Sequence, residues 1–352
     1  MQGTERAFDL LIIGGGPAGL LAATVFGRHG YSVACVEVSP DLPARQSDHV
    51  HLFQAESLNT IDAWMPGFMR SLVENGAIRV DGDGYTVAAG AGHPHPSRAV
   101  LDTTLRVLCE QRIFHAKALA IHDEGDCWRL QLSDGGDLSG RRIIDASGQA
   151  RRSLSGVSTS ATSQLVLHEG PRTGGYLSTV VSRLGTPPDL GVMRIRGSEN
   201  SPGLLGIRLD CRRWQVTLQF PAGAALTSWE AAVNALPPSV REMFSRHRRV
   251  TPAIRCGGRR STFLGADKPC RPGNWLPIGD ALLCTPPYQG NGLANIVSQL
   301  RCIDEGLEIG SSFEQISDQV WDEAQSVWMQ AAMMDAISNP SILEALANRR
   351  TA

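Results

Sequence analysis

A strand, a glycine-rich loop, a helix and a second strand follow one another at the start of the chain. Residues 8–13 are apolar except for Asp9, which is typical of a strand buried on both faces. They lead into a GxGxxG loop formed by Gly14, Gly16 and Gly19, and then into a helix predicted to end near residue 30. The second strand ends in Glu37, where a carboxylate can accept from an adenosine ribose hydroxyl. This order predicts a parallel sheet with a dinucleotide pyrophosphate at the helix N-terminus.

A second glycine-rich signature lies far downstream of the first. Gly279-Asp280-Ala281 follows an apolar run and precedes Pro286-Pro287 and Gly290-Asn291-Gly292. A carboxylate at such a strand end can accept a hydrogen bond from a flavin ribityl chain. The prolines and glycines beyond it let backbone N–H groups approach the ring system closely. Together the two signatures indicate FAD, held by Gly14, Gly16, Gly19, Glu37, Gly279, Asp280, Gly290, Asn291 and Gly292.

Composition narrows the classes of partner and compartment. The 352 residues are 42% hydrophobic, enough for one large core or two joined cores. The net charge of −2 indicates neither a nucleic-acid nor an anionic-membrane partner. Eight cysteines without a CxxC pair favour reduced thiols over a disulfide framework. With no signal peptide and no apolar run of about 20 residues, we expect a cytoplasmic protein without a membrane span.

The chain resembles the para-hydroxybenzoate-hydroxylase-like FAD superfamily, that is, group A flavoprotein monooxygenases with their flavin halogenase and geranylgeranyl-reductase relatives. Residues 279–293 (GDALLCTPPYQGNGL) keep the GDA-x4-PP-x4-GL register of the hydroxylases. The resemblance implies that Arg45 reaches the FAD pyrophosphate and that Arg98 lies beside the cofactor. It also implies a cofactor-binding role for Asp145, which opens a D-A-S-G strand end similar to that of the halogenase and reductase branches.

The resemblance also implies the domain plan. We expect an α/β protein with an FAD-binding Rossmann-like domain of the glutathione-reductase type, formed by residues 1–65, 97–160 and 261–311. An antiparallel-sheet substrate domain would use residues 66–96 and 161–260, and a C-terminal helical segment would use 312–352. Residues 204–220 have the pattern of a β-hairpin. In its second arm apolar side chains alternate with polar ones, so one face should pack and the other should meet water or ligand.

For activity, the resemblance implies an FAD-dependent monooxygenase. A C4a-hydroperoxyflavin would hydroxylate or epoxidise an apolar, aromatic or alkene substrate, either a free small molecule or one carried by a protein. NAD(P)H, with NADP(H) as one form, or a separate reductase would supply electrons. Pro287 and Tyr288 are predicted near C4a, and His51 near the reacting centre. No metal site is predicted, because the histidine pairs at 49/51 and 93/95 have no acid or cysteine at ligand spacing.

Three other functions stay open from the sequence. A geranylgeranyl-reductase-like reductase or dehydrogenase fits the segment Asp145-Ala-Ser-Gly148, which stands where hydroxylases carry a C-D-G triplet. A non-catalytic flavoprotein or a maturation partner would use the same cofactor site without turnover. A flavin halogenase is less favoured, since the WxWxIP motif of that branch is absent.

Overall fold

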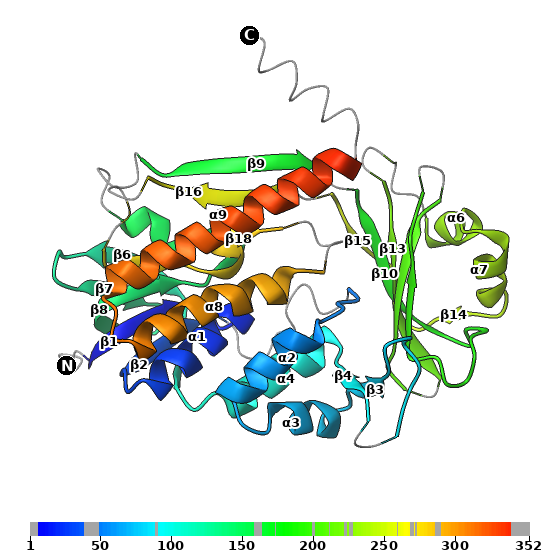
Figure 1. Ribbon diagram of the computed structural model, residues 1–352, viewed down its shortest axis with the longest axis horizontal. Coiled ribbons are helices and arrows are strands. Elements are labelled where there is room, and N and C mark those ends of the chain that lie inside the picture. Colours follow the sequence, from blue (N-terminus) through cyan, green and yellow to red (C-terminus); the bar gives the residue numbers. More distant parts are fainter. Residues whose placement is uncertain are drawn as a thin grey trace, which may run out of the picture. The chain divides into compact units, whose positions relative to one another are not determined.

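The computed structural model, shown in Figure 1, describes residues 6–38, 49–88, 91–157, 164–172, 174–198, 201–210, 212–221, 224, 228–258, 260–267, 271, 273–285 and 290–338. The chain forms two compact units. Unit 1 comprises Met1–Pro40, Cys109–Pro171 and Arg260–Ala352, and unit 2 comprises Asp41–Leu108 and Arg172–Arg259. Each unit is therefore built from segments that are distant in the sequence.

A mostly parallel sheet forms the centre of unit 1. Its strands run in the order β5-β2-β1-β8-β7-β6, and β17 also pairs with β8. β1, β2, β5, β8 and β17 are parallel neighbours, whereas β6 and β7 join as an antiparallel extension. The bounds are β1 Arg6–Ile13, β2 Val33–Glu37, β5 Arg112–His115, β6 Ala118–Asp123, β7 Trp128–Leu132, β8 Asp137–Asp145 and β17 Trp275–Pro277. The predicted α/β fold class is confirmed.

The apolar run of β1 is buried as the sequence indicates, with Leu10, Leu11 and Ile12 fully shielded from solvent. Three helices pack in succession in unit 1, with α8 (Gly292–Glu308) beside both α1 (Pro17–Arg28) and α9 (Phe313–Ser338) (Figure 1). Unit 1 also contains a smaller sheet of β9 (Val166–Arg172), β16 (Arg260–Gly265) and β18 (Leu283–Cys284), and α9 packs against β16.

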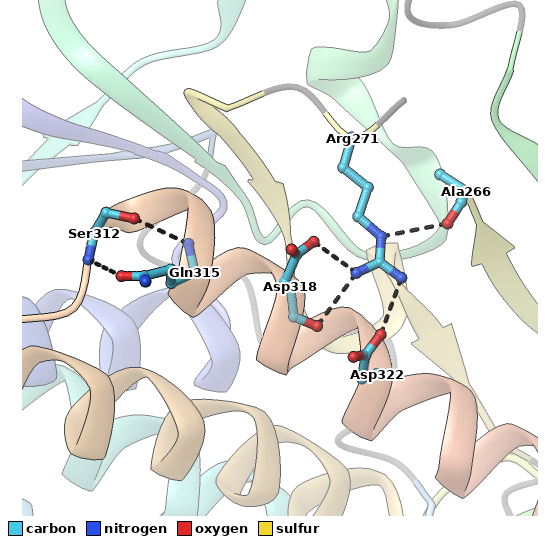
Figure 2. A network of polar contacts seen from close by, with 6 residues as sticks. All are labelled: Ala266, Arg271, Ser312, Gln315, Asp318 and Asp322. Atoms are coloured by element: carbon cyan, nitrogen blue, oxygen red, sulfur yellow. Dashed lines mark hydrogen bonds and ion pairs between the residues drawn. The ribbon is translucent and has the colours of Figure 1, made fainter. Parts of the chain in front are cut away.

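Arg271 fixes α9 to the segment that follows β16, as Figure 2 shows. Its guanidinium donates to the Asp318 carboxylate at 2.8 Å and to the Asp322 carboxylate at 3.2 Å, and it lies over the Trp321 ring at 5.4 Å. At the start of α9 the backbone N–H of Ser312 donates to the Gln315 side chain, and the Gln315 N–H donates to the Ser312 hydroxyl. This reciprocal cap explains why the helix begins at residue 313.

Unit 2 is built around an antiparallel sheet of order β11-β12-β13-β10-β14, with β15 also paired to β10. Around it, the described residues of unit 2 form the helices α2, α3 and α4, a small β3–β4 ladder and two short helices, α6 and α7. The bounds are α2 Ala55–Trp64, α3 Phe68–Glu74, β3 Ile78–Val80, β4 His93–His95, α4 Arg98–Leu108, β10 Tyr176–Ser182, β11 Val192–Ile195, β12 Gly203–Arg208, β13 Arg213–Gln219, α6 Trp229–Asn234, α7 Pro238–Met243, β14 Arg248–Arg249 and β15 Ile254–Cys256. The predicted hairpin is present as β12–β13.

The two faces of β13 differ from expectation in one respect. Trp214, Val216 and Leu218 enter the core with α6 and α7, as predicted. The polar face was expected to be open, but Gln215 and Thr217 are buried too, at 4% and 2% exposure. The reason is the chain at residues 49–50. The Val50 N–H donates to the Thr217 hydroxyl at 2.9 Å, so this segment covers the polar face.

The compact units also divide the chain differently from the predicted domains. Residues 41–65 and 97–108, expected in the FAD-binding domain, lie in unit 2, and residues 161–171, expected in the substrate domain, lie in unit 1. The C-terminal helix, expected as a separate segment, lies in unit 1 against α8 and β16. Residues 339–352 of the predicted helical segment fall outside the described part of the chain.

Candidate functional site

The loop between β1 and α1 passes very close to the end of β8. Gly14 has φ +109, a conformation that favours glycine, and its N–H donates to the Val36 carbonyl at 2.8 Å. A Cβ at Gly14 would lie 2.4 Å from the Ala146 carbonyl oxygen, and one at Gly19 would lie 1.8 Å from the Gly14 oxygen. At Gly16, by contrast, a Cβ would meet nothing within 4 Å. The loop is thus closed on its protein side and open at Gly16.

The start of α1 has the properties of an anion site. Its N-cap residue, Gly16, supplies no side-chain cap, and the first turn carries no acidic residue. The N–H groups there and the helix dipole favour a negative group. Glu37, at the end of β2, accepts from the Gly15 N–H at 2.5 Å and so holds the loop in place. Contact between Glu37 and a ribose hydroxyl stays a prediction.

Asp145 ends β8 and is fully buried. One of its oxygens accepts from the N–H and hydroxyl of Ser147 at 2.9 and 2.6 Å. The other accepts from the N–H and hydroxyl of Ser153, also at 2.9 and 2.6 Å. The Ser153 hydroxyl in turn accepts from the Trp275 indole at 2.7 Å. The structure therefore shows Asp145 shaping the turn after β8, while direct contact with a cofactor stays a prediction.

Arg151 and Gln149 join the end of β8 to the second signature. Arg151 donates from Nε to the Ala281 carbonyl at 2.9 Å and from Nη2 to the Thr262 hydroxyl at 3.0 Å. Gln149 donates to the Cys284 sulfur at 2.9 Å. Burial lowers the pKa of the Arg151 guanidinium from its ordinary value. Sequence reasoning missed both residues, because they lie in a segment without periodicity.

Gly279 brings the second signature against the first. Its φ is +58, and its N–H donates to the Gln299 side chain at 2.7 Å. A Cβ at Gly279 would lie 2.9 Å from the Cβ of Ala18 in the first turn of α1. A Cβ at Gly148 would lie 4.0 Å from the Cβ of Asp280. The first turn of α1, the end of β8 and the Gly279–Ala281 turn (η4) therefore meet in unit 1.

The segment after η4 leads into α8. Gly290 has φ +68, Asn291 is the N-cap without a side-chain cap bond, and a Cβ at Gly292 would meet nothing within 4 Å. The first turn of α8 has no acidic residue, so its N-terminus is suited to negative charge. The buried Asn295 side chain donates to the Thr285 hydroxyl at 2.9 Å, which anchors the chain leading to residues 286–289. Pro287, Tyr288 and also Arg45 lie outside the described residues.

Arg98 and His51 belong to unit 2. Arg98 donates from Nε to Asp102 at 2.8 Å, and burial raises the pKa of Asp102. His51 stacks on Phe53 with ring centroids 6.0 Å apart. Their roles beside the cofactor and the reacting centre stay predictions. In the described part of the chain, no three His, Cys, Asp or Glu residues are grouped to hold a metal ion, and no helix there is long and apolar enough to cross a membrane.

The chain is similar to several known proteins. The family model described as "Lycopene cyclase protein" matches residues 9–171. A menaquinone reductase of Mycobacterium tuberculosis is 26% identical over 343 residues, which cover 89% of this chain and 77% of that protein. A flavoprotein/dehydrogenase structure from Cytophaga hutchinsonii has a TM-score of 0.70 at 15% identity, covering 96% of this chain and 87% of that chain. The halogenase PltM, solved with phloroglucinol and FAD, has a TM-score of 0.65 at 13% identity, covering 90% of this chain and 73% of that chain.

The predicted resemblance to the FAD-dependent flavoprotein superfamily that includes monooxygenases and halogenases is confirmed. Within that superfamily the chain is a relative of flavin-dependent oxidoreductases. The predicted cofactor, FAD, is confirmed at this level. The residues fit it on structural grounds of their own, because the loop around Gly14 leaves open space at Gly16 beside uncapped N–H groups of α1.

Proposed function

We propose that this chain is an FAD-dependent reductase that saturates a carbon–carbon double bond of an apolar, isoprenoid-type substrate. The observation that carries the proposal is the match to a menaquinone reductase along 89% of the chain, which spans both compact units. The match to the lycopene cyclase family covers residues 9–171, which include segments of both units. Menaquinone and lycopene are both isoprenoid compounds, so the two matches agree on the chemical class of substrate.

The strand end after β8 supports the same choice. Hydroxylases of this superfamily carry a C-D-G triplet where this chain has Asp145-Ala-Ser-Gly148, and that segment resembles the halogenase and reductase branches. Here the Asp145 carboxylate is enclosed by Ser147 and Ser153, and Gly148 takes φ +68 beside Asp280. A rigid, fully hydrogen-bonded turn of this kind would position the neighbouring Asp280 without moving during turnover.

When bound, FAD supplies two-electron redox chemistry, and the protein supplies binding, orientation and exclusion of water. In our proposal, Gly14, Gly16 and the N-terminus of α1 hold the pyrophosphate, and Glu37 adds a contact to the ribose. Asp280 accepts from the ribityl chain, and Gly290, Asn291 and Gly292 present the N-terminus of α8 to the region where negative charge gathers. Arg45 and Arg98 are proposed to reach the pyrophosphate, and Pro287, Tyr288 and His51 to face the substrate.

A second candidate is monooxygenation of an apolar substrate, either free or protein-borne. It is favoured by the uninterrupted GDA-x4-PP-x4-GL register of residues 279–293, which is that of the hydroxylases. In either case the electrons would come from NAD(P)H or from a separate reductase. The structural likeness to halogenases is a likeness of fold and does not favour halogenation.

Product mass distinguishes the two candidates. The FAD-loaded protein would be supplied with NADPH, or with dithionite in place of a partner reductase, and with a short-chain menaquinone or a geranylgeranyl lipid. Any quinol is first reoxidised to the quinone in air, because quinone reduction also adds two hydrogen atoms. We then expect a lipid that still carries two added hydrogen atoms, formed equally when turnover runs under nitrogen and under ¹⁸O₂. A product that requires oxygen and carries one ¹⁸O atom would replace the reductase proposal with the monooxygenase. Asp280→Ala, which should lose FAD, is the control for flavin dependence.

A further inference from the structure

An open groove lies in unit 2, at the end of the antiparallel sheet where β10 and β12 finish and β13 begins. It has a volume of about 760 Å³ and is lined by Ser182, Arg183, Leu184, Thr186, Pro188, Arg208, Arg212 and Trp214. This size falls within the range of small-molecule sites. All of its lining residues belong to one compact unit, and none of them belongs to the flavin signatures.

The groove carries positive charge without matching negative charge. Three of its eight described lining residues are arginines, and none of these eight is acidic. Among the residues that the structure describes, no carboxylate pairs with Arg183, Arg208 or Arg212. The carboxylate of the nearby Asp210 forms its ion pair with Arg213, which does not line the groove. The same carboxylate accepts from the backbone N–H groups of residues 212 and 213 and from the Arg213 side chain at 2.6 Å. The neighbouring Arg249 is paired with Glu230.

Arg208 is held rigidly in the groove wall. Its two terminal nitrogens donate to the carbonyls of Pro188 at 2.7 Å and Pro187 at 3.0 Å, and its guanidinium lies 5.1 Å from the Trp214 ring centroid. Its Nε is buried and has no hydrogen-bond partner within the described residues. The carbonyl and ring contacts fix the guanidinium in the groove wall, so Arg208 adds positive charge beside the exposed Arg183 and Arg212.

Arg183 adds a second, independent observation. It has φ +58, a left-handed conformation that is unfavourable for a residue with a long side chain. The loop is fixed by the N–H of Gly185, which donates to the Met243 carbonyl at 2.7 Å. Strained backbone of this kind concentrates at ligand sites, where the surrounding structure holds it. Here the strained residue is Arg183 itself, which directly follows β10 and is exposed.

We propose that this groove is a binding site for a phosphate or diphosphate group, distinct from the flavin site and carried by a ligand with an apolar body. Guanidinium groups match phosphate oxygens with paired hydrogen bonds. The exposed Arg183 and Arg212 can make such bonds, and Arg208 adds the charge of its fixed guanidinium. Leu184, Pro188 and the edge of Trp214 provide apolar wall beside the charge. The ligand is either a free diphosphate compound or a lipid that carries a diphosphate headgroup.

The test uses the FAD-loaded protein and inorganic pyrophosphate, titrated by calorimetry at constant ionic strength. Arg212→Gln removes an exposed charge, and Arg183→Gly removes a charge while giving the φ +58 position to the residue that tolerates it best. We expect each variant to weaken pyrophosphate binding by about tenfold, in line with the loss of one charge-assisted hydrogen bond. Arg183→Gly should melt no lower than the wild type, so a folding defect cannot explain its loss of binding.

Arg194→Gln is the matched control, because Arg194 is exposed on β11 of the same sheet and does not line the groove. Unchanged affinity in both groove variants, or equal weakening by the Arg194 control, would overturn the proposal. Geranyl diphosphate then distinguishes the two sources of the ligand. Tighter binding than pyrophosphate, lost in the groove variants, supports a lipid-borne headgroup. Equal binding would show that the groove takes a free diphosphate compound and would contradict the apolar body of the proposed ligand.

Discussion

The two sheets of this protein end in opposite arrangements of charge. In unit 1, the buried carboxylate of Asp145 at the end of the parallel sheet accepts four hydrogen bonds. In unit 2, three arginines line an open groove at the end of the antiparallel sheet, and none of its described lining residues is acidic. The first arrangement is complete within the chain and needs no ligand to be stable. The second leaves the positive charge of three arginines available to a ligand. The difference indicates a preformed framework at the flavin signatures and a receptive site in unit 2.

The largest loss of stability should come from a substitution in the loop between β1 and α1. Gly14→Ala combines a positive φ with a Cβ placed 2.4 Å from the Ala146 oxygen. We expect a loss of roughly 4 kcal/mol in unfolding free energy, together with loss of bound flavin. Gly30→Ala is the control, since Gly30 has φ +81 but no atom within 4 Å of its added Cβ. Urea denaturation should show a cost of about 1 kcal/mol there, with flavin retained. Equal losses of unfolding free energy in the two variants would show that the close approach of Gly14 to Ala146 does not set the cost of the substitution.

Asp145 and Asp280 should separate stability from cofactor binding. Asp145→Ala leaves the donors of Ser147 and of the fully buried Ser153 without their acceptor, and should lower the unfolding free energy of the flavin-free protein by about 3 kcal/mol. Asp280→Ala should change it by less than about 1 kcal/mol while raising the dissociation constant for FAD by about tenfold or more. Thermal denaturation of the flavin-free proteins and FAD titration measure the two quantities. The reverse pattern would mean that Asp145, not Asp280, contacts the cofactor.

The smallest effect should appear in unit 2 as a dependence on pH. Burial, aided by the nearby His93, lowers the pKa of His95, and the His95 Nδ1 is buried without a partner among the described residues. The unfolded chain therefore binds this proton first as pH falls below about 6.5, and stability is lost there at up to about 1.4 kcal/mol per pH unit. His95→Gln should flatten that fall between pH 7.5 and 5.5, by about 1 kcal/mol. Exposed His115 provides the control variant, and a curve for His95→Gln that parallels the wild type would contradict the assignment.

Much of unit 1 could be predicted from the sequence because its strands are apolar runs bounded by glycine signatures. The position of Gly14 and the burial of residues 10–12 follow from the local pattern alone. The contact of Gly279 with Ala18 required two distant signatures to be read together. Arg151 and Gln149 could not be predicted, since their partners at 262, 281 and 284 are set by tertiary packing and no spacing announces them.

Unit 2 shows the limit of periodicity more clearly. Alternation along β13 correctly placed Trp214, Val216 and Leu218 on the core face. It could not show that residues 49–50 cover the opposite face, because that contact joins segments far apart in the sequence. The arginine groove was missed for the same reason: its lining comes from the ends of three strands, and only the register of β10, β12 and β13 brings them together.

The central claim is that the two glycine signatures of unit 1 form one FAD site, and the flavin released from the purified protein tests it most directly. After heat denaturation, chromatography of the supernatant should give FAD at about one molecule per chain for the wild type, and little or none for Asp280→Ala purified in the same way. Protein that remains colourless after incubation with FAD, or that releases another nucleotide in its place, would contradict the account.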